Sequence, residues 1–223
     1  MMVGVVLAAG ASRRMGRPKP LVRSSGKSFA AHGIRHLWSG CNEVVVVLGS
    51  NAGTVRSEVE AEFQRMVGTG ELGRDLRSAH RHGAAGLEVN FAPNPKWKSG
   101  MYGSVRFGLK RALELEPEGV LVLPVDHPAV RPETVIGLAE LLRASLEACR
   151  SARERHRFRY ALVPRYRRRR GHPVALSAAL ARDIAGDSGA ENLSDAMRRN
   201  ARLLGFLDVE DPGVVKNVNT PTD

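Results

Sequence analysis

Three short apolar runs constrain the fold more than any other feature of this chain. They cover residues 3–8 (VGVVLA), 43–49 (EVVVVLG) and 119–126 (GVLVLPVD), and between their end positions they hold no polar side chain. A strand with one face in water alternates apolar and polar residues, whereas a strand covered on both faces is apolar throughout. The runs therefore predict buried strands in the interior of a parallel sheet.

Helical patterns lie between these strands. Apolar residues recur at three- and four-residue spacing in segments 28–38, 54–66, 101–115 and 132–149, and a further short strand is predicted at 87–92. Strands that alternate with helices indicate an α/β fold. We predict a single-domain, Rossmann-like α/β/α sandwich with a mostly parallel sheet. Ligands of such sheets bind outside the carboxyl ends of the strands.

The rest of the chain is less regular. One domain is expected to span residues 1–223, with residues 67–86, rich in Gly, Arg and His, as a mobile surface insertion. The patterns in the last third predict strands at 160–164, 173–176 and 204–209 and helices at 177–185 and 193–200.

Composition narrows the class of protein. The 223 residues carry a formal net charge of +11, which indicates an anionic partner, although most of the basic residues are arginine and genome composition alone can produce that bias. Cys41 and Cys149 are too few and too far apart for a disulfide framework or a zinc site. The first apolar run is short and its basic residues follow it, which argues against a secretory signal. We expect a cytoplasmic protein with no membrane partner.

A basic loop follows the first strand. The small residues Ala8, Ala9 and Gly10 allow a sharp turn that brings backbone N–H groups close to an anion. Arg13, Arg14, Arg17 and Lys19 then add about four positive charges, which match the roughly four negative charges of a nucleoside triphosphate. The alternative interpretation is a solvated surface loop.

A second glycine-rich stretch, residues 24–28 (SSGKS), has the end of a phosphate-binding P-loop. The P-loop pattern also requires a glycine five residues before Gly26, and that position holds Leu21. A surface turn that precedes a helix is the better interpretation.

The spacing around the first loop resembles a known signature. Leu7-Ala8-Ala9-Gly10-x-Ser12-x-Arg14-Met15-Gly16-x-x-Lys19-x-Leu21 is similar to that of the MobA-like NTP transferases, and closest to the molybdenum cofactor cytidylyltransferases. The resemblance implies the sheet architecture of the nucleotide-diphospho-sugar transferases. It also implies that the triphosphate is held by the loop amides of residues 7–10, by Ser12, and by Arg14 and Lys19 as the catalytic cations.

Further matches to this family extend over most of the chain. Residues 94–109 (NPKWKSGMYGSVRFGL) resemble a segment in which Asn94, Gly100 and Ser104 would line the nucleoside pocket. Residues 123–128 (LPVDHP) resemble a motif that would place Asp126 on the metal. Simple helix entry and strand capping are the structural alternatives for these residues.

The acceptor side of the site is also implied by resemblance. Residues 169–176 and 186–193 resemble acceptor-binding segments of the cytidylyltransferases and, together with the residue after Asp126, supply four candidate acceptor-binding residues: His127, Gly171, His172 and Asp187. Residues 150–159 are also rich in arginine, but we interpret them as exposed surface and not as part of the acceptor site.

The closing motif departs from the family pattern. Residues 217–223 (NVNTPTD) carry Asn217 and Asn219 where the cytidylyltransferases usually carry aspartates. An amide oxygen of Asn219 can still ligate Mg²⁺ beside Asp126, but without the negative charge that strengthens metal binding. We therefore expect the asparagines to weaken metal binding and, with it, activity.

The sequence therefore predicts a Mg²⁺-dependent nucleotidyltransferase. It would move a nucleoside monophosphate from an NTP, with CTP first, to a phosphorylated acceptor such as molybdopterin, and would release pyrophosphate. The resemblance implies that the residues after the first strand form the floor of the base site, which reads Leu-Ala-Gly-Gly in guanylyltransferases and Leu-Ala-Ala-Gly in cytidylyltransferases. The methyl group of Ala9 narrows this floor relative to glycine, which favours CTP. A molybdoenzyme or cofactor-insertion protein is a candidate partner. The alternatives are a sugar-phosphate nucleotidyltransferase, a nucleic-acid-binding protein that uses the arginines between residues 150 and 170, and a nucleotide-sensing module.

Overall fold

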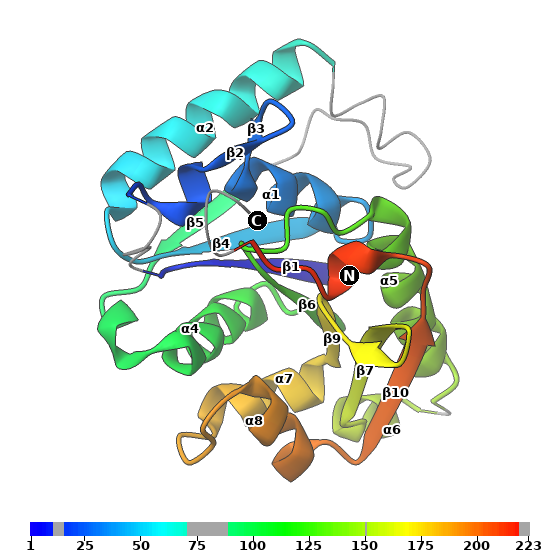
Figure 1. Cartoon of the computed structure of the whole chain (residues 1–223). Helices are drawn as coiled ribbons and strands as arrows, with labels where there is room; N and C mark the ends of the chain where they lie inside the picture. Colours follow the sequence, from blue (N-terminus) through cyan, green and yellow to red (C-terminus); the bar gives the residue numbers. More distant parts are fainter. Residues whose placement is uncertain (11–15, 71–88, 150, 219–223) are drawn as a thin grey trace.

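A sheet of eight strands crosses the centre of the described part of the chain (Figure 1). The computed structural model describes residues 1–10, 16–70, 89–149 and 151–218. The order is β10-β7-β9-β6-β1-β4-β5, with β8 paired to β7. The strands are β1 (Met2–Ala8), β4 (Glu43–Leu48), β5 (Val89–Pro93), β6 (Gly119–Pro124), β7 (Tyr160–Tyr166), β8 (Arg169–Arg170), β9 (Val174–Ser177) and β10 (Leu203–Asp208).

The predicted parallel interior is confirmed. β1 lies between β4 and β6 and pairs with both in parallel, with Val5 opposite Val45 on one side and Val122 on the other. β5 extends the parallel set, whereas β9 runs antiparallel to both of its neighbours, β6 and β7. Every residue of β1 and β6 is buried, as expected for strands that are apolar on both faces.

Helices cover both faces of the sheet (Figure 1). One core contains alternate strand residues such as Val44 and Val46, packed with α1 (Phe29–Trp38), α2 (Ala52–Gly68) and α5 (Pro132–Glu147). The other core contains Val45 and Val47, packed with α4 (Met101–Leu113), α7 (Ala178–Gly186) and α8 (Leu193–Asn200). The period-two alternation of the valine run thus divides one strand between two cores.

Side-chain caps begin several helices at the positions that the sequence indicates. Ser28 Oγ accepts a hydrogen bond from Ala31 N at the start of α1, and Ser177 and Asn192 cap α7 and α8 in the same way. The stretch SSGKS joins β2 (Arg23–Ser24) to β3 (Lys27–Ser28) by a turn in which Ser25 and Gly26 have positive φ. This confirms the surface turn before a helix.

Two sequence predictions need correction. The predicted insertion at 67–86 begins too early, because Val67 and Gly68 belong to α2; residues 71–86 of it lie outside the described residues. The short helix α6 (Ala152–Arg157) was not predicted, because its sequence ARERHR has no apolar face. In the described residues, no helix has the length and apolarity needed to cross a membrane.

The carboxyl ends of β1, β4 and β6 meet at one edge of the sheet. Gly49, directly after β4, lies so close to the turn after β1 that a Cβ atom there would be 2.1 Å from the carbonyl oxygen of Ala9. The backbone amide of Val125, after β6, donates to Leu7 O at 3.1 Å. These contacts hold the three strand ends together without a ligand.

Close packing of α4 on the sheet depends on Gly108. A Cβ atom at this position would lie 2.7 Å from Val5 Cγ1 and 2.8 Å from Val47 Cγ2. We expect Gly108→Val to lower the free energy of unfolding by about 1–3 kcal/mol, because overpacking forces the helix away from the sheet. Chemical denaturation measures this change.

Gly53→Ala in α2 is the matched control, because a Cβ atom there meets nothing within 4 Å. It should leave stability unchanged or raise it by up to about 1 kcal/mol through helix propensity. Equal destabilisation by both substitutions would contradict the packing argument.

Candidate functional site

A cavity of about 440 Å³ opens at the carboxyl end of β1. We call it the Trp97 cavity. Its lining comes from the turn after β1 and from the segment that leads into α4, and includes Leu7, Ala9, Gly10, Trp97, Gly100 and Ser104. Ala8 does not line it, because its side chain points into the core on the other face of the sheet. The small residues of the predicted loop therefore divide between a cavity wall and the core.

The entry to α4 forms the second wall of the Trp97 cavity. Gly100 precedes the helix with φ of 101°, a conformation that favours glycine, and its carbonyl accepts from Ser104 N at 3.3 Å. Asn94 is buried and donates its side-chain amide to Ser104 Oγ at 3.2 Å, while its Oδ1 accepts from Lys96 N at 2.9 Å. Asn94 thus fixes the position of the Ser104 side chain.

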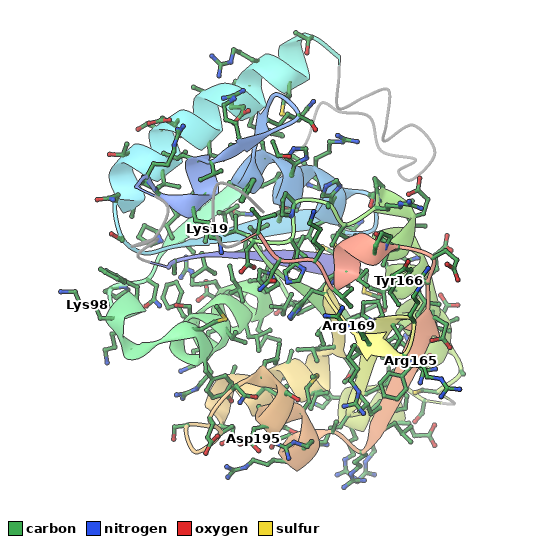
Figure 2. All side chains as sticks on the ribbon, in the orientation of Figure 1. Lys19, Lys98, Arg165, Tyr166, Arg169 and Asp195 are labelled. Atoms are coloured by element: carbon green, nitrogen blue, oxygen red, sulfur yellow. The ribbon has the colours of Figure 1, made fainter. Side chains whose placement is uncertain are left out.

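An ion pair lies beside this cavity. Lys19, at the start of the 3-10 turn η1 (Lys19–Leu21), places Nζ 3.2 Å from Asp126 Oδ2, just after β6. Their side chains are only 17% and 16% exposed. Two segments 107 residues apart in sequence therefore bring a positive and a negative charge together at the carboxyl edge of the sheet. Figure 2 shows Lys19 next to β1.

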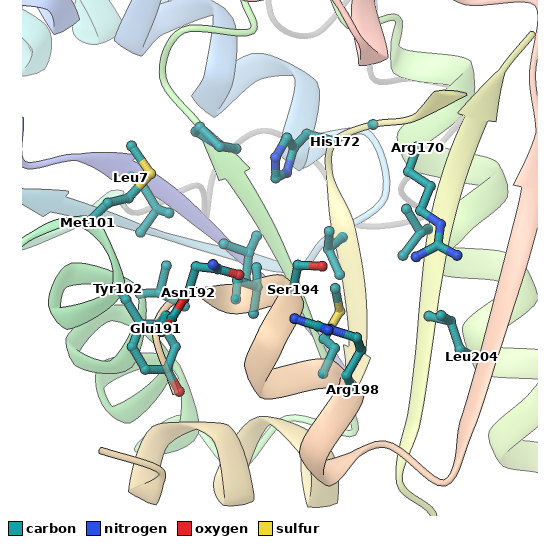
Figure 3. A pocket seen from close by; sticks show the side chains of 18 residues that line it. Leu7, Met101, Tyr102, Arg170, His172, Glu191, Asn192, Ser194, Arg198 and Leu204 are labelled. Carbon is teal, nitrogen blue, oxygen red and sulfur yellow. The ribbon is translucent and has the colours of Figure 1, made fainter. Parts of the chain in front are cut away.

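A second cavity, of about 390 Å³, lies between α4, α8 and the β9 side of the sheet (Figure 3). We call it the His172 cavity. Much of its lining is apolar, for example Val105, Val163, Val174 and Met197, and His172, Arg170 and Arg198 are polar groups in the wall. Leu7 and Met101 line both cavities, so the two spaces adjoin at these side chains.

Two histidines connect Asp126 with the His172 cavity. The rings of His127 and His172 lie 4.9 Å apart, and His127 Nε2 is 4.0 Å from Asp126 Oδ1. Burial lowers the pKa of His127, and burial together with the neighbouring His127 lowers the pKa of His172 to about 4. Both rings are therefore neutral near pH 7. His172 lines the cavity, whereas His127 is buried behind it.

The C-terminal segment wraps around these residues. His172 N donates to Val214 O at 2.9 Å, and Val218 N donates to Asp126 O at 2.8 Å. Gly171 is needed here, because a Cβ atom would be 2.3 Å from Val214 O. The segment thereby places residues 217 and 218 beside Asp126.

Asp211 anchors this segment. Its carboxylate is buried and accepts hydrogen bonds from Arg131 N, Thr134 Oγ1 and Gly213 N, each at 2.8 Å. The first two donors lie at the start of α5, so the negative charge of the carboxylate also interacts favourably with the positive end of that helix dipole.

Most of the predicted site residues that fall on described positions lie together. Lys19, Leu7, Ala9, Gly10, Gly100, Ser104, Asp126, Gly171 and His172 all lie at the two cavities or in the ion pair beside them. Ser12, Arg14 and Asn219 lie outside the described residues.

Asp187 is not brought into either cavity. Its carboxylate accepts hydrogen bonds from Asn200 Nδ2 at 2.8 Å and Gly189 N at 2.9 Å, and the bond from Asn200 lowers the pKa of Asp187. Tyr102 Oη donates to Asp187 O at 2.9 Å. Asp187 therefore holds the link between α7 and α8, and α8 in turn forms a wall of the His172 cavity.

Several lining residues were missed by sequence reasoning. Trp97 and Met101 fall inside the segment 94–109 that the resemblance singled out, so an aromatic residue next to a helix entry was the available signal. Met197 and Arg198 of α8 could not be recognised from local sequence, because they reach the site only when α8 folds against α7.

The arginine-rich stretch 165–170 forms the β7–β8 hairpin. Arg165 pairs with Asp208 through two hydrogen bonds of 2.9 and 2.7 Å and, like Arg170, stacks on the ring of Phe206. Arg167, Arg168, Arg169 and Arg170 are all exposed, and Arg170 also lines the His172 cavity. Figure 2 shows Arg165 and Arg169 next to β7 and β10.

The described side chains supply only part of the set of oxygen ligands that a hard divalent cation needs. Asp126 supplies a carboxylate at a strand end, and oxygen ligands of this kind are those that Mg²⁺ takes. Among residues 1–10, 16–70, 89–149 and 151–218, no group of three or more His, Cys, Asp and Glu side chains could hold a metal ion.

Comparison with known proteins identifies relatives that cover almost the whole chain. Residues 4–203 match the model of the MobA-like NTP transferase domain. The chain is 30% identical over 225 residues to nicotine blue oxidoreductase of Paenarthrobacter nicotinovorans, which covers 98% of this chain and 92% of that protein. It is also 30% identical over 184 residues to a probable molybdenum cofactor guanylyltransferase of Opitutus terrae, covering 78% and 84%.

Solved structures share the fold. Rv0371c of Mycobacterium tuberculosis H37Rv has a TM-score of 0.68 and 21% identity, covering 100% of this chain and 95% of that one. Its complex with manganese has a TM-score of 0.56 and 20% identity, covering 93% and 88%.

The anchoring role of Asp211 gives a stability test. We expect Asp211→Ala to lower the free energy of unfolding by about 2–5 kcal/mol, because three buried donors lose a charged acceptor. Asp211→Asn should lose less, since the amide oxygen still accepts. Chemical denaturation of the wild type and of each variant measures these differences in the free energy of unfolding.

Asp208→Ala is the matched control. Asp208 is 70% exposed and ion-paired with Arg165 at the surface, and such pairs contribute about 0–1 kcal/mol. A loss for Asp211→Ala no larger than that for Asp208→Ala would contradict the anchoring role.

Proposed function

The chain belongs to the MobA-like NTP transferase family, and on that premise we propose that it transfers a cytidylyl group from CTP to a phosphorylated small molecule such as molybdopterin. Pyrophosphate is the second product and Mg²⁺ the cofactor. The observation that carries the proposal is the pair of adjoining cavities that share Leu7 and Met101, with Lys19 and Asp126 beside them. A reaction between two bound substrates needs both held close together and aligned, which two adjoining spaces allow.

The Trp97 cavity is the proposed nucleotide site. Leu7, Ala9 and Gly10 form its floor, and Gly100 and Ser104 face them from the entry to α4, with Asn94 behind Ser104. Backbone amides of residues 7–10, Ser12 and the cations Arg14 and Lys19 would hold the triphosphate. These groups lie after β1, where ligands of parallel sheets bind.

The proposed reaction needs positioning and charge stabilisation more than acid–base chemistry. An oxygen of the acceptor phosphate attacks the α-phosphorus of CTP in line; the new P–O bond forms as the bond between the α-phosphorus and the bridging oxygen breaks. Pyrophosphate leaves with that electron pair. An acceptor phosphate is already ionised at neutral pH, so no proton has to be removed, and Lys19 and Arg14 would stabilise the charge that develops on the phosphates.

Asp126 and Asn219 are the proposed metal ligands. The hydrogen bond from Val218 N to Asp126 O supports this pairing, because it places the residue before Asn219 beside Asp126. When bound, a divalent cation would neutralise phosphate charge and orient the reacting groups. The manganese complex of the structural neighbour Rv0371c is consistent with use of a divalent metal.

The His172 cavity is the proposed acceptor site. Gly171 and His172 line it, His127 supports the ring of His172, and Asp187 acts indirectly through the position of α8. Its apolar walls suit a flat heterocycle. Its polar side chains suit hydrogen bonding to that heterocycle; they are Tyr102, Arg170, His172, Glu191, Asn192, Ser194 and Arg198. We further propose that one domain spans the chain, that the reaction occurs in the cytoplasm, and that the product passes to a molybdoenzyme or a cofactor-insertion protein.

A second candidate function is oxidoreduction. It is favoured by one observation: the relative that covers 98% of this chain is named nicotine blue oxidoreductase. Loss of the visible absorbance of nicotine blue with NADH or NADPH tests this candidate directly.

Pyrophosphate release tests the proposed transfer. The purified protein is incubated with each NTP and a panel of phosphorylated acceptors, molybdopterin among them. Lys19→Ala should lower turnover at saturating CTP about 100-fold or more, by analogy with the loss of about 3 kcal/mol when one transition-state donor is removed. Lys110→Ala, an exposed lysine on α4 away from both cavities, is the control. Turnover of Lys19→Ala near the wild-type value would exclude the assigned role of Lys19.

The base preference gives a separate test. All four NTPs compete at equal concentration for transfer by the wild type and by Ala9→Gly. We expect the wild type to prefer CTP, and Ala9→Gly to shift the CTP:GTP ratio toward GTP, because shape differences of one methyl group are worth about 1–3 kcal/mol. A wild-type preference for GTP, or an unchanged ratio, would contradict the role given to Ala9.

A further inference from the structure

We propose that the indole ring of Trp97 is the surface on which the nucleobase stacks. The inference rests on the proposed nucleotide site and adds a residue that decides affinity for the base. Trp97 lies in the 3-10 turn η3 (Trp97–Ser99), directly before Gly100 and α4. Of the described residues that line the Trp97 cavity, it is the only aromatic one.

The indole is held in position before any ligand binds. Trp97 N donates to Asn94 O at 3.3 Å, and the ring is half-buried against the core on the α4 side of the sheet. Lys98 Nζ lies over a face of the ring, 5.7 Å from its centroid, and shows that a ligand-sized group can approach the π-face. Because the ring is already packed on one side, stacking a base on it costs little side-chain entropy.

The remaining wall leaves room for a flat ring. Ala9, Gly10 and Gly100 offer a methyl group and bare backbone, and a Cβ atom added at Gly10 or at Gly100 would meet nothing within 4 Å. The lining is completed by Leu7, Lys98, Met101 and Ser104. A cavity with one aromatic side chain and a stretch of short residues in its wall has room for a planar heterocycle.

Stacking and shape would then have separate effects. Every base presents a π-face, and stacking on an aromatic side chain contributes about 1–3 kcal/mol with little sequence preference. Trp97 would therefore raise the affinity for all NTPs, while Ala9 would distinguish among them. The triphosphate, held by the loop after β1, would gain nothing from Trp97.

Binding measurements separate these contributions without any turnover. CTP and inorganic tripolyphosphate are titrated by calorimetry into the wild type, Trp97→Leu and Trp97→Phe. We expect Trp97→Leu to weaken CTP binding about 5- to 150-fold and to leave tripolyphosphate binding unchanged. Trp97→Phe should restore most of the CTP affinity. Lys110→Ala is the matched control, because this exposed lysine of α4 lines neither cavity; it should bind both ligands as the wild type does.

Intrinsic fluorescence provides a second readout. The chain has two tryptophans, and Trp38 is fully buried in the core against Phe63. CTP should quench emission of the wild type but not of Trp97→Leu, whose remaining signal comes from Trp38.

Three outcomes would overturn the inference. CTP binding by Trp97→Leu at wild-type affinity would exclude stacking and leave the proposed function intact. Equal loss of CTP and tripolyphosphate would show that Trp97 only supports the fold of the site. Failure of the wild type to bind any NTP would remove the proposed function and this inference together.

Discussion

Burial of the central strands on both faces is the constraint on which the rest of the structure depends. In β1 and β6 every side chain before Pro124 packs into one of two cores, so no polar side chain can point out of the sheet along their length. Charged and hydrogen-bonding groups are confined to the strand ends. The turn after β1 and the residues after β6 are held against each other by the bond from Val125 N to Leu7 O. The site therefore forms where the sheet stops.

The ion pair between Lys19 and Asp126 is the main polar consequence of this arrangement. Both side chains are largely removed from water, and each reduces the cost of burying the other. In the proposed reaction the same two groups serve different substrates, since Lys19 would bind phosphate oxygens and Asp126 a divalent cation. The pair would have to separate when the nucleotide arrives with its metal. The attraction of Lys19 to phosphate and of Asp126 to the cation must then compensate for the attraction that the two side chains lose.

The fold and much of the lining of the Trp97 cavity could be predicted from sequence, because both depend on local pattern. The valine run specifies β4 as an interior strand of the sheet, and Lys19 and Asp126 follow strand ends that the topology brings together. The His172 cavity depends on tertiary packing instead. Met197 and Arg198 reach the His172 cavity only because Tyr102 and Asp187 hold the link between α7 and α8. Asp187 was therefore predicted in the right region, but its contacts are with this link and not with a cavity.

The dependence of CTP affinity on metal, measured by calorimetry on the wild type and on Asp126→Asn, tests the central claim most directly. We expect Mg²⁺ to raise the CTP affinity of the wild type at least about tenfold, or about 1.4 kcal/mol, and to have no such effect on Asp126→Asn. Without metal, Asp126→Asn should bind CTP more tightly than the wild type, because the carboxylate no longer repels the triphosphate or holds Lys19. A metal effect of equal size in both proteins, or no metal effect in the wild type, would contradict the account.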